Sequence, residues 1–321
     1  MKAAVYTENG PPDVLAYTDV PDPVCGPGDV LVDVSAISIE GGDTGNRAGG
    51  ELASIPHIVG YQCAGTVIEV GAEVDDRSVG DDVVCIMLYG SHAERVAVGA
   101  GQTWLVPDGL DLVRAACVPV PFGTADDCLF EFGHLEAGET VLIQAGGGGV
   151  GIAAVQLARL AGATVLATAS ADWKFERLAP LGLNHGINYR EVDFAVEARR
   201  ITNGAGVDLV VDSVGDTLAG SIAALAYRGR AITVGDASRS RAPIDVGVLM
   251  AGNLSLTGVF LGAEAVMAAD RVHAMIARHL ASIAAGELLV VVDSEFPLAD
   301  AVDAHRRAES REAFGRVVMR A

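Results

Sequence analysis

Cysteine is scarce in this chain, and its few copies are not spaced as a disulfide or metal cluster. The five cysteines are Cys25, Cys63, Cys85, Cys117 and Cys128, and no two of them form C-x-x-C. An odd number without such pairs argues against a disulfide framework and against a cysteine-bound zinc lobe. We therefore expect small, reduced thiols that are buried as hydrophobic residues.

Basic charge and long apolar runs are missing as well. The formal net charge is −20, which argues against nucleic acid and anionic membranes, because both need basic patches. No apolar run reaches the length of a membrane span, and residues 1–6 enter a strand-like pattern without the layout of a signal peptide. These absences predict a cytoplasmic, soluble protein that binds neither nucleic acid nor membrane.

Regions of different pattern follow one another along the 321 residues. Residues 1–121 are β-rich, with short strands separated by Gly, Asp and Pro, which predicts a small barrel or sandwich. A glycine-rich loop at residues 40–50 interrupts the strands, and such loops are either floppy or functional. The strands are expected at residues 30–34, 64–70, 83–87, 93–98 and 104–106.

Residues 122–260 alternate strands with helices, which is the rhythm of an α/β domain with a doubly wound parallel sheet. The strands are expected at residues 140–145, 164–168, 207–212, 230–234 and 255–260, and the helices at residues 149–161, 172–181, 192–201 and 217–226. Later elements are too few to fold alone and should return to complete the first region. They are a helix at residues 263–285, a strand at 289–292, a helix at 298–307 and a strand at 315–319.

The strongest motif lies in residues 141–160. An apolar strand leads into Ala-Gly-Gly-Gly-Gly-Val-Gly at residues 145–151, and helical spacing follows until Gly162. Gly146, Gly148 and Gly151 satisfy G-x-G-x-x-G. Glycine tolerates a positive φ in the turn, lets the backbone approach a pyrophosphate and lets the helix pack closely. The helix start would then face the phosphates, so the motif predicts a dinucleotide site; the alternative is a glycine-rich loop without a ligand.

The end of the second strand favours NADPH over NADH. It lacks the carboxylate that would bind the ribose 2′-hydroxyl of NAD. Ser170 at this tip and Lys174 in the next helix could instead meet a 2′-phosphate, and Tyr189 could cover the adenine. Asp172 is a counter-signal, because it would repel phosphate. Lys174 is one of only two lysines, and its alternative is an ordinary solvated helix lysine.

Several further motifs occur in an order that resembles a known family. They are Met-Lys-Ala-Ala at residues 1–4, Pro-Gly-Asp-Val-Leu-Val at 27–32, Gly-Tyr-Gln-Cys-Ala-Gly at 60–65, Gly-Asp-Asp-Val-Val at 80–84, Val-Asp-Ser-Val-Gly at 211–215 and Gly-Arg-Val-Val at 315–318. With the glycine turn, they resemble the medium-chain dehydrogenase/reductase superfamily. Within it the chain looks like the zinc-independent, zeta-crystallin-like NADPH:quinone oxidoreductases.

The resemblance implies a Rossmann-type cofactor domain at residues 122–260 and a GroES-like catalytic domain at residues 1–121 and 261–321. It also implies a nicotinamide held in a cleft between them, and a homodimer or tetramer joined near residues 254–260. Thr124 would lie near the nicotinamide. The cofactor site would comprise Gly146, Gly148, Gly149, Val150, Gly151, Ser170, Lys174, Tyr189, Val214, Gly235 and Phe260.

The substrate loops depart from the family pattern. Zinc-dependent relatives have a Cys where this chain has Glu40 and Gly-His-Glu where it has Gly-Tyr-Gln at residues 60–62, so we expect no metal site. Quinone reductases usually have Asn in place of Glu40, Tyr in place of Gly45 and Glu in place of Gln62. These differences leave hydride transfer intact but weaken any inference about the substrate.

Tyr61 is the candidate catalytic donor. A quinone or enone gains negative charge on its oxygen as hydride arrives, and a hydrogen-bond donor aimed at that oxygen would help. Glu40 could hold Tyr61 or relay a proton, with Asp43 and Thr44 completing the loop. The alternatives are that Tyr61 packs beneath the barrel and that Glu40 pairs with Arg47. The histidines His57 and His92 are expected to be structural or surface groups rather than bases.

Together these residues predict an NADPH-dependent reductase that transfers hydride to a small-molecule quinone or α,β-unsaturated carbonyl. The nearest rival is an enoyl reductase of a lipid or polyketide pathway, in which protonation of carbon would give Tyr61 a larger role. A zinc alcohol dehydrogenase is disfavoured by the missing ligands. A non-catalytic NADPH-binding sensor or scaffold belongs to a different class, and the altered substrate loops keep it open.

Overall fold

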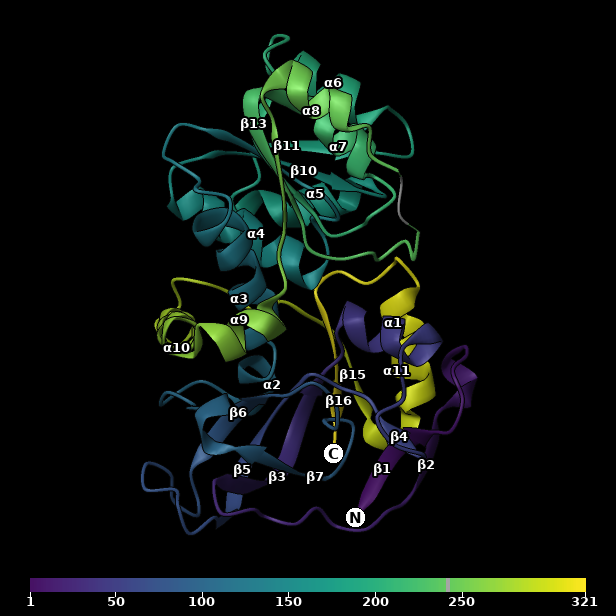
Figure 1. Cartoon of the computed structure of the whole chain (residues 1–321), viewed down its shortest axis with the longest axis vertical. Helices are drawn as coiled ribbons and strands as arrows, with labels where there is room; N and C mark the ends of the chain where they lie inside the picture. The colour runs from purple at the N-terminus through teal and green to yellow at the C-terminus, as the bar shows by residue number, and fades with distance from the viewer. Residues whose placement is uncertain (241–242) are drawn as a thin grey trace. The chain divides into compact units, whose positions relative to one another are not determined.

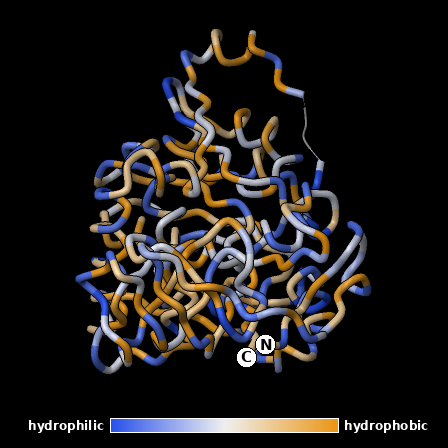
Figure 2. The backbone as a smooth tube through the Cα atoms, turned by 60° about the horizontal axis from the view of Figure 1, so that its bottom comes forward, coloured by the Kyte–Doolittle hydropathy of each residue, from blue (hydrophilic) through white to orange (hydrophobic). Residues whose placement is uncertain are grey.

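The computed structural model describes residues 1–240 and 243–321, which divide into two compact units (Figure 1). Unit 1 comprises Met1–Gly123 and Gly262–Ala321, and unit 2 comprises Thr124–Leu261. Hydrophobic and hydrophilic stretches alternate along the backbone (Figure 2), and no helix of the described residues is long and apolar enough to cross a membrane. Four of the five cysteines are buried, Cys25 is half-buried, and all are free, as expected of small hydrophobic residues.

Unit 1 is built on a seven-stranded sheet and a three-stranded sheet. The larger one has the order β15-β16-β3-β5-β6-β8, and β7 also pairs with β3. Val30, Val32 and Val34 alternate along β3 and are buried in the core of this unit. The strands are β1 (Lys2–Tyr6), β2 (Ala16–Asp19), β3 (Asp29–Ser38), β4 (His57–Ile58), β5 (Gln62–Val70), β6 (Asp82–Ile86), β7 (Arg95–Gly99), β8 (Thr103–Leu105), β15 (Val292–Pro297) and β16 (Arg316–Arg320).

The last strand of the chain completes this larger sheet, as expected for elements that return to the first region. β16 pairs antiparallel with β3, with Val318 opposite Ser38 and Met319 opposite Ile37. It also pairs in parallel with β15. The helical elements of the unit are η1 (Pro12–Val14), α1 (Gly41–Gly49), η2 (Ala100–Gln102), α2 (Leu112–Ala115), α9 (Leu261–Met267), α10 (Ala269–Ala284), η5 (Leu298–Asp300) and α11 (Ala301–Glu309); α3 (Pro119–Asp126) and α9 each cross a boundary between the units.

The expectation of a loop at residues 40–50 is wrong, because most of this segment forms helix α1. The Asp43 carboxylate accepts a hydrogen bond from the Glu40 backbone N–H at 2.8 Å and so closes the first turn. The glycines of this segment concealed the helix, since glycine has a low helix propensity. An acidic residue in the first turn and Arg47 in the last turn suit the helix dipole.

The bounds of the C-terminal elements also differ from those that the sequence predicts. The strand expected at residues 289–292 begins only at the end of that range, as β15, where its register with β16 starts at Val292 and Arg316. The helix expected at residues 263–285 is divided into α9 and α10 at Ala268, whose φ of −132° and ψ of 44° are not helical. No glycine or proline marks this break in the sequence.

Unit 2 confirms the doubly wound parallel sheet. Its six strands have the order β11-β10-β9-β12-β13-β14, and all the pairings are parallel. Helices α4, α5, α6 and α7 pack against these strands (Figure 1). The strands are β9 (Thr140–Ile143), β10 (Thr164–Ala169), β11 (His185–Asn188), β12 (Val207–Asp212), β13 (Leu225–Thr233) and β14 (Ser255–Gly258). The helical elements are a π-helix (Asp127–Glu131), α4 (Gly149–Leu160), α5 (Asp172–Leu178), η4 (Ala179–Leu181), α6 (Phe194–Ile201), α7 (Leu218–Ala224) and α8 (Val246–Gly252).

The strand order reverses beside β9, the first strand of this sheet. The chain runs from β9 to β10 and β11 on one side, and then to β12, β13 and β14 on the other. In open α/β sheets, ligands bind beyond the carboxyl ends of the strands at such a reversal. The segments that follow β9 and β12 are therefore the expected place for a ligand.

Candidate functional site

The glycine-rich turn connects β9 to α4. Its positive φ falls on Ala145, at 53°, rather than on a glycine. The glycines provide space instead: a Cβ on Gly151 would lie 2.4 Å from the Ala145 carbonyl oxygen, and one on Gly146 would lie 2.7 Å from the Ala167 Cβ. The expectation of close packing is thus confirmed, whereas the expected use of glycine for a positive φ in the turn is wrong.

The first turn of α4 is suited to a phosphate group. Gly148 is the N-cap residue, with an extended φ of −82° and ψ of 171°, and it forms no side-chain capping bond. The first N–H groups of a helix have no partner within the helix, and they lie at the positive end of its dipole. We expect the N–H groups of Gly149, Val150 and Gly151 to face the phosphates of a dinucleotide, whereas the Gly148 N–H already donates to the Ala145 carbonyl at 2.9 Å.

The other predicted cofactor residues follow the carboxyl ends of the parallel strands. Because those ends meet at one edge of a parallel sheet, these residues share the edge that holds the glycine turn. Each one's contact with a cofactor stays a prediction. Ser170 follows β10, Tyr189 follows β11, Val214 follows β12, Gly235 follows β13 and Phe260 follows β14.

Lys174 is buried, so its interpretation as an ordinary solvated helix lysine is wrong. Only 6% of its surface is exposed, and its Nζ lies 5.4 Å from the centroid of the Trp173 ring. The counter-signal Asp172 is engaged, because its Oδ1 accepts a hydrogen bond from Asn188 Nδ2 at 3.1 Å. A buried lysine in α5, the helix that follows β10, is a feature that the sequence alone did not reveal.

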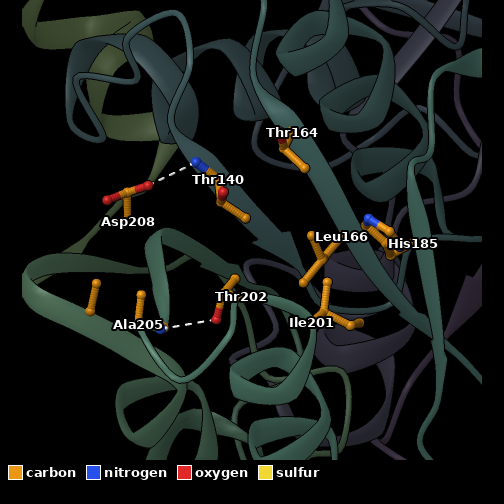
Figure 3. Close-up of a pocket in the computed structure, with 10 residues that line it drawn as sticks. Thr140, Thr164, Leu166, His185, Ile201, Thr202, Ala205 and Asp208 are labelled. Atoms are coloured by element: carbon orange, nitrogen blue, oxygen red, sulfur yellow. Dashed lines mark hydrogen bonds between the residues drawn. The ribbon is translucent and has the colours of Figure 1, made fainter.

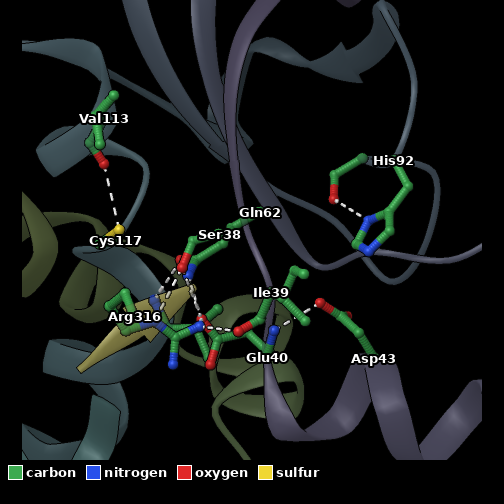
Figure 4. Close-up of polar contacts among 11 residues, drawn as sticks. Ser38, Ile39, Glu40, Asp43, Gln62, His92, Val113, Cys117 and Arg316 are labelled. Atoms are coloured by element: carbon green, nitrogen blue, oxygen red, sulfur yellow. Dashed lines mark hydrogen bonds and ion pairs between the residues drawn. The ribbon is translucent and has the colours of Figure 1, made fainter. Parts of the chain in front are cut away.

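Glu40 lies at the centre of a buried polar cluster in unit 1 (Figure 4). Arg316 Nη2 forms an ion pair with its Oε1, and Gln62 Nε2 donates a hydrogen bond to the same atom. Arg316 Nε donates to Ser38 Oγ at 2.9 Å. The expected alternative of a Glu40–Arg47 pair is wrong, because Arg47 pairs with Glu309. Burial raises the pKa of Glu40 to about 7, although Arg316 and the hydrogen bonds oppose this rise.

The residues at the zinc-ligand positions do not fit a catalytic zinc. Arg316 and Gln62 already engage the Glu40 carboxylate, and Gln62 Oε1 accepts a hydrogen bond from the Val120 N–H at 2.9 Å. Within residues 1–240 and 243–321, no group of three or more His, Cys, Asp or Glu side chains could hold a metal ion.

Tyr61 is half-buried, and its ring packs against the first turn of α1. Its ring lies so close to Gly42 that a Cβ there would be 2.2 Å from Tyr61 Cε2. Its phenolic oxygen accepts a hydrogen bond from Asn46 Nδ2 at 2.8 Å, so Asn46 rather than Glu40 holds the phenol. Burial, followed by the nearby Asp43 carboxyl, raises the pKa of Tyr61 to about 12, so the phenol carries its proton at neutral pH. The sequence gives no sign of Asn46, because its pattern predicts a loop where α1 brings Asn46 to Tyr61.

The remaining candidates occupy packed positions. His92 and His305 are buried and share a hydrogen bond of 3.0 Å between their Nε2 atoms. Burial lowers the pKa of His92 to about 3, which leaves it neutral, and His57 is buried beside the Tyr6 ring. These placements support the structural interpretation of His57 and His92. Thr44 Oγ1 donates to the Gly41 carbonyl at 2.9 Å, and Thr124 is buried in α3.

Comparisons with known proteins match nearly the whole chain. Residues 26–108 match the family "Alcohol dehydrogenase GroES-like domain", and residues 149–278 match the family "Zinc-binding dehydrogenase". The 2-haloacrylate reductase of a Burkholderia species is 35% identical over 343 residues, covering 99% of this chain and 98% of that protein. The Escherichia coli quinone oxidoreductase complexed with NADPH has a TM-score of 0.95 and 28% identity, with each chain covered completely. A Pseudomonas syringae quinone oxidoreductase has a TM-score of 0.94 and 28% identity, covering 100% of this chain and 99% of that one.

Proposed function

Because the chain belongs to the medium-chain dehydrogenase/reductase superfamily, in its quinone oxidoreductase-like branch, we propose that it is an NADPH-dependent reductase of quinones or α,β-unsaturated carbonyls. NAD(P)H-dependent oxidoreduction is the activity of this type of protein. Within this activity, we propose that the cofactor is NADPH. We also propose that the acceptor carries a carbonyl group that activates the carbon receiving the hydride.

The observation that carries the proposal is the arrangement of β9, the glycine turn and α4. Gly146 and Gly151 leave no room for side chains, and the first N–H groups of α4 have no side-chain cap. A buried lysine, Lys174, in the helix that follows Ser170 supports the choice of NADPH, because a 2′-phosphate bound after β10 would add negative charge that a cation can meet.

Bound NADPH would supply the hydride, and the chain's own residues would orient the acceptor and stabilise its charge. We propose that Tyr61 donates its phenolic hydrogen to the acceptor oxygen. Asn46 Nδ2 already donates to the phenolic oxygen, which leaves the phenol's own hydrogen for another acceptor. A phenol with a pKa of about 12 is a hydrogen-bond donor at neutral pH and a poor acid, which favours stabilising an oxyanion over protonating carbon.

The experiment that tests this proposal follows oxidation of NADPH, and separately of NADH, by the purified protein. The acceptors are 1,4-benzoquinone, 9,10-phenanthrenequinone, 2-chloroacrylate and an enoyl thioester. Turnover of a quinone or of 2-chloroacrylate with a preference for NADPH supports the proposal. Turnover of the thioester alone points to an enoyl reductase, and NADPH binding without turnover points to a sensor. Failure to bind either nucleotide overturns the proposed cofactor site.

Replacing Tyr61 by phenylalanine is expected to lower kcat on the order of tenfold to a hundredfold, since it removes one donor to the developing oxyanion. NADPH affinity should be unchanged. Tyr17→Phe is the matched control, because Tyr17 is an exposed tyrosine on β2. Steady-state kinetics and fluorescence titration with NADPH measure these effects. Unchanged turnover in Tyr61→Phe would leave the phenol with a packing role.

Replacing Lys174 by glutamine is expected to raise the KM for NADPH about tenfold, with little change for NADH, because a charge-assisted bond to the 2′-phosphate is lost. Arg177→Gln is the control, because this exposed cation lies 6.0 Å from the same Trp173 ring. The ratio of kcat/KM for the two cofactors is the measurement. Equal losses with NADPH and NADH would exclude recognition of the 2′-phosphate by Lys174.

A further inference from the structure

A continuous chain of hydrogen bonds crosses unit 2 beneath the glycine turn. The Ala145 N–H donates to Thr168 Oγ1 at 3.1 Å, and the Thr168 hydroxyl donates to Gln144 Oε1 at 2.7 Å. Gln144 Nε2 donates to Ser221 Oγ at 3.1 Å, and the Ser221 hydroxyl donates to Asp212 Oδ2 at 2.7 Å. The four side chains of this hydrogen-bond network come from different elements. Thr168 lies on β10, Gln144 directly follows β9, Ser221 lies on α7 and Asp212 ends β12.

The two ends of this chain fix the direction of every bond in it. The Ala145 N–H can only donate, and Asp212 accepts from the Ser221 hydroxyl and from two backbone N–H groups. Each hydroxyl between them accepts one hydrogen bond and donates one, so the Gln144 amide has a single orientation that satisfies both neighbours. Thr168, Gln144, Ser221 and Asp212 are all buried, and a fully satisfied buried network holds its members in one arrangement.

Asp212 also holds the loop that follows β12. Its Oδ1 accepts hydrogen bonds from the Val214 N–H at 2.9 Å and from the Gly215 N–H at 3.1 Å. The Thr217 hydroxyl lies within 2.9 Å of both carboxylate oxygens. One carboxylate is therefore bonded both to the loop after β12 and, through Ser221, Gln144 and Thr168, to the turn after β9.

This network lies at the reversal of the strand order, between β9 and β12, where open α/β sheets bind their ligands. Asp212 has no exposed surface, so it cannot contact a nucleotide itself. We infer that Asp212, Ser221, Gln144 and Thr168 are positioning residues that hold the glycine turn and the Val214 loop in one fixed arrangement, ready for the dinucleotide. The inference rests on the cofactor part of the proposed function and adds the residues that preorganise its site.

The test breaks the chain at different links and measures NADPH binding rather than turnover. Ser221→Ala, Thr168→Val and Gln144→Leu each remove one link, and each is expected to raise the Kd for NADPH about tenfold. At saturating NADPH, kcat with 1,4-benzoquinone should stay within about twofold of the wild-type value, because these residues do not touch the acceptor. Three separate links keep the test valid if one variant does not fold.

A double variant tests whether the links act as one chain. If they do, Ser221→Ala/Thr168→Val should bind NADPH no more than about twofold more weakly than either single variant. Independent contributions would multiply to about a hundredfold. If the increases in Kd multiply in the double variant, the four residues do not act as one hydrogen-bond network. If the Kd is unchanged in all the single variants, the network has only a structural role.

Thr202→Val is the matched control, because Thr202 lies at the opposite ends of the strands of the same sheet. Thr202 Oγ1 donates to the Ala198 carbonyl at 2.9 Å and accepts from the Gly206 N–H at 3.0 Å. It lines a cavity of about 290 Å³ at the amino ends of the strands (Figure 3). This variant should lower the melting temperature without changing the Kd for NADPH, whereas the chain variants should change both. Absence of NADPH binding by the wild-type protein would overturn the proposed function together with this inference, whereas normal binding by every variant would overturn the inference alone.

Discussion

Gly151→Ala is expected to weaken NADPH binding about a hundredfold, because the new methyl group has no space. Its Cβ would lie 2.4 Å from the Ala145 carbonyl oxygen and 2.7 Å from the Gly146 Cα. Both are backbone atoms of the turn, so α4 has to move away from β9 to accept the substitution. That movement displaces the first N–H groups of α4 from the phosphates, and fluorescence titration with NADPH measures the loss.

Gly45→Ala is the matched control for this substitution. Gly45 also lies within a helix, α1, but nothing lies within 4 Å of the position of its Cβ. There the methyl group should stabilise the helix by up to about 1 kcal/mol and leave NADPH binding unchanged. If Gly151→Ala binds NADPH as well as Gly45→Ala does, the close packing of α4 against the turn is not what makes the site.

Arg316→Met is expected to reduce the free energy of unfolding by about 1 kcal/mol more at pH 8 than at pH 5, because it leaves the buried Glu40 carboxylate without its partner. Arg316 donates to Ser38, to the Ile39 carbonyl and to Glu40. Methionine replaces the aliphatic part of the side chain and none of these bonds. Urea denaturation at a series of pH values measures the change.

The loss should depend on pH in a defined direction. Burial raises the folded-state pKa of Glu40 to about 7 in the wild-type protein, and removing Arg316 raises this pKa further. A raised carboxyl pKa contributes stability below the unfolded-state value that is lost as the pH rises through the folded-state value. The deficit of Arg316→Met should therefore be smaller near pH 5, where only the bonds to Ser38 and Ile39 are lost, and should grow above pH 7.

The double variant Glu40→Gln/Arg316→Met separates the buried charge from packing. It removes both charges, and exchange of a buried ion pair for neutral groups often costs little. Its stability should exceed that of Arg316→Met above pH 7, and it should lack the fall in stability that titration of Glu40 gives the wild-type protein as the pH rises towards 7. An equal deficit of Arg316→Met at pH 5 and pH 8 would show that the unpaired carboxylate is not its cause.

The cofactor unit was largely predictable because its signals are local. The apolar run ending at Ile143, the glycines at residues 146–151 and the helical spacing up to Gly162 lie within one short segment, and the sheet follows from the repetition of strand and helix. The positive φ at Ala145 could not be predicted, since alanine gives no sign of it. The Ala145 N–H donates to Thr168, which lies on a neighbouring strand and is distant in the sequence.

The polar contacts of unit 1 were not predictable, because they join residues far apart in the sequence. Glu40 meets Arg316 across 276 positions, and Asn46 meets Tyr61 only because residues 41–49 form a helix. A one-dimensional pattern identified Glu40 and Tyr61 as unusual but could not supply their partners. The burial of Lys174 is similar, since its helical position alone suggested an exposed side chain.

The antiparallel pairing of β16 with β3 has a consequence for synthesis on the ribosome. Every residue of unit 2, up to Leu261, leaves the ribosome before β16 is made. Until then Ile37 and Ser38 at the end of β3 lack their partner strand, although β7 already pairs with Asp29–Asp33, and Glu40 lacks its partner Arg316. Unit 2 can therefore fold during translation, whereas the larger sheet of unit 1 is completed only after β16 has been made.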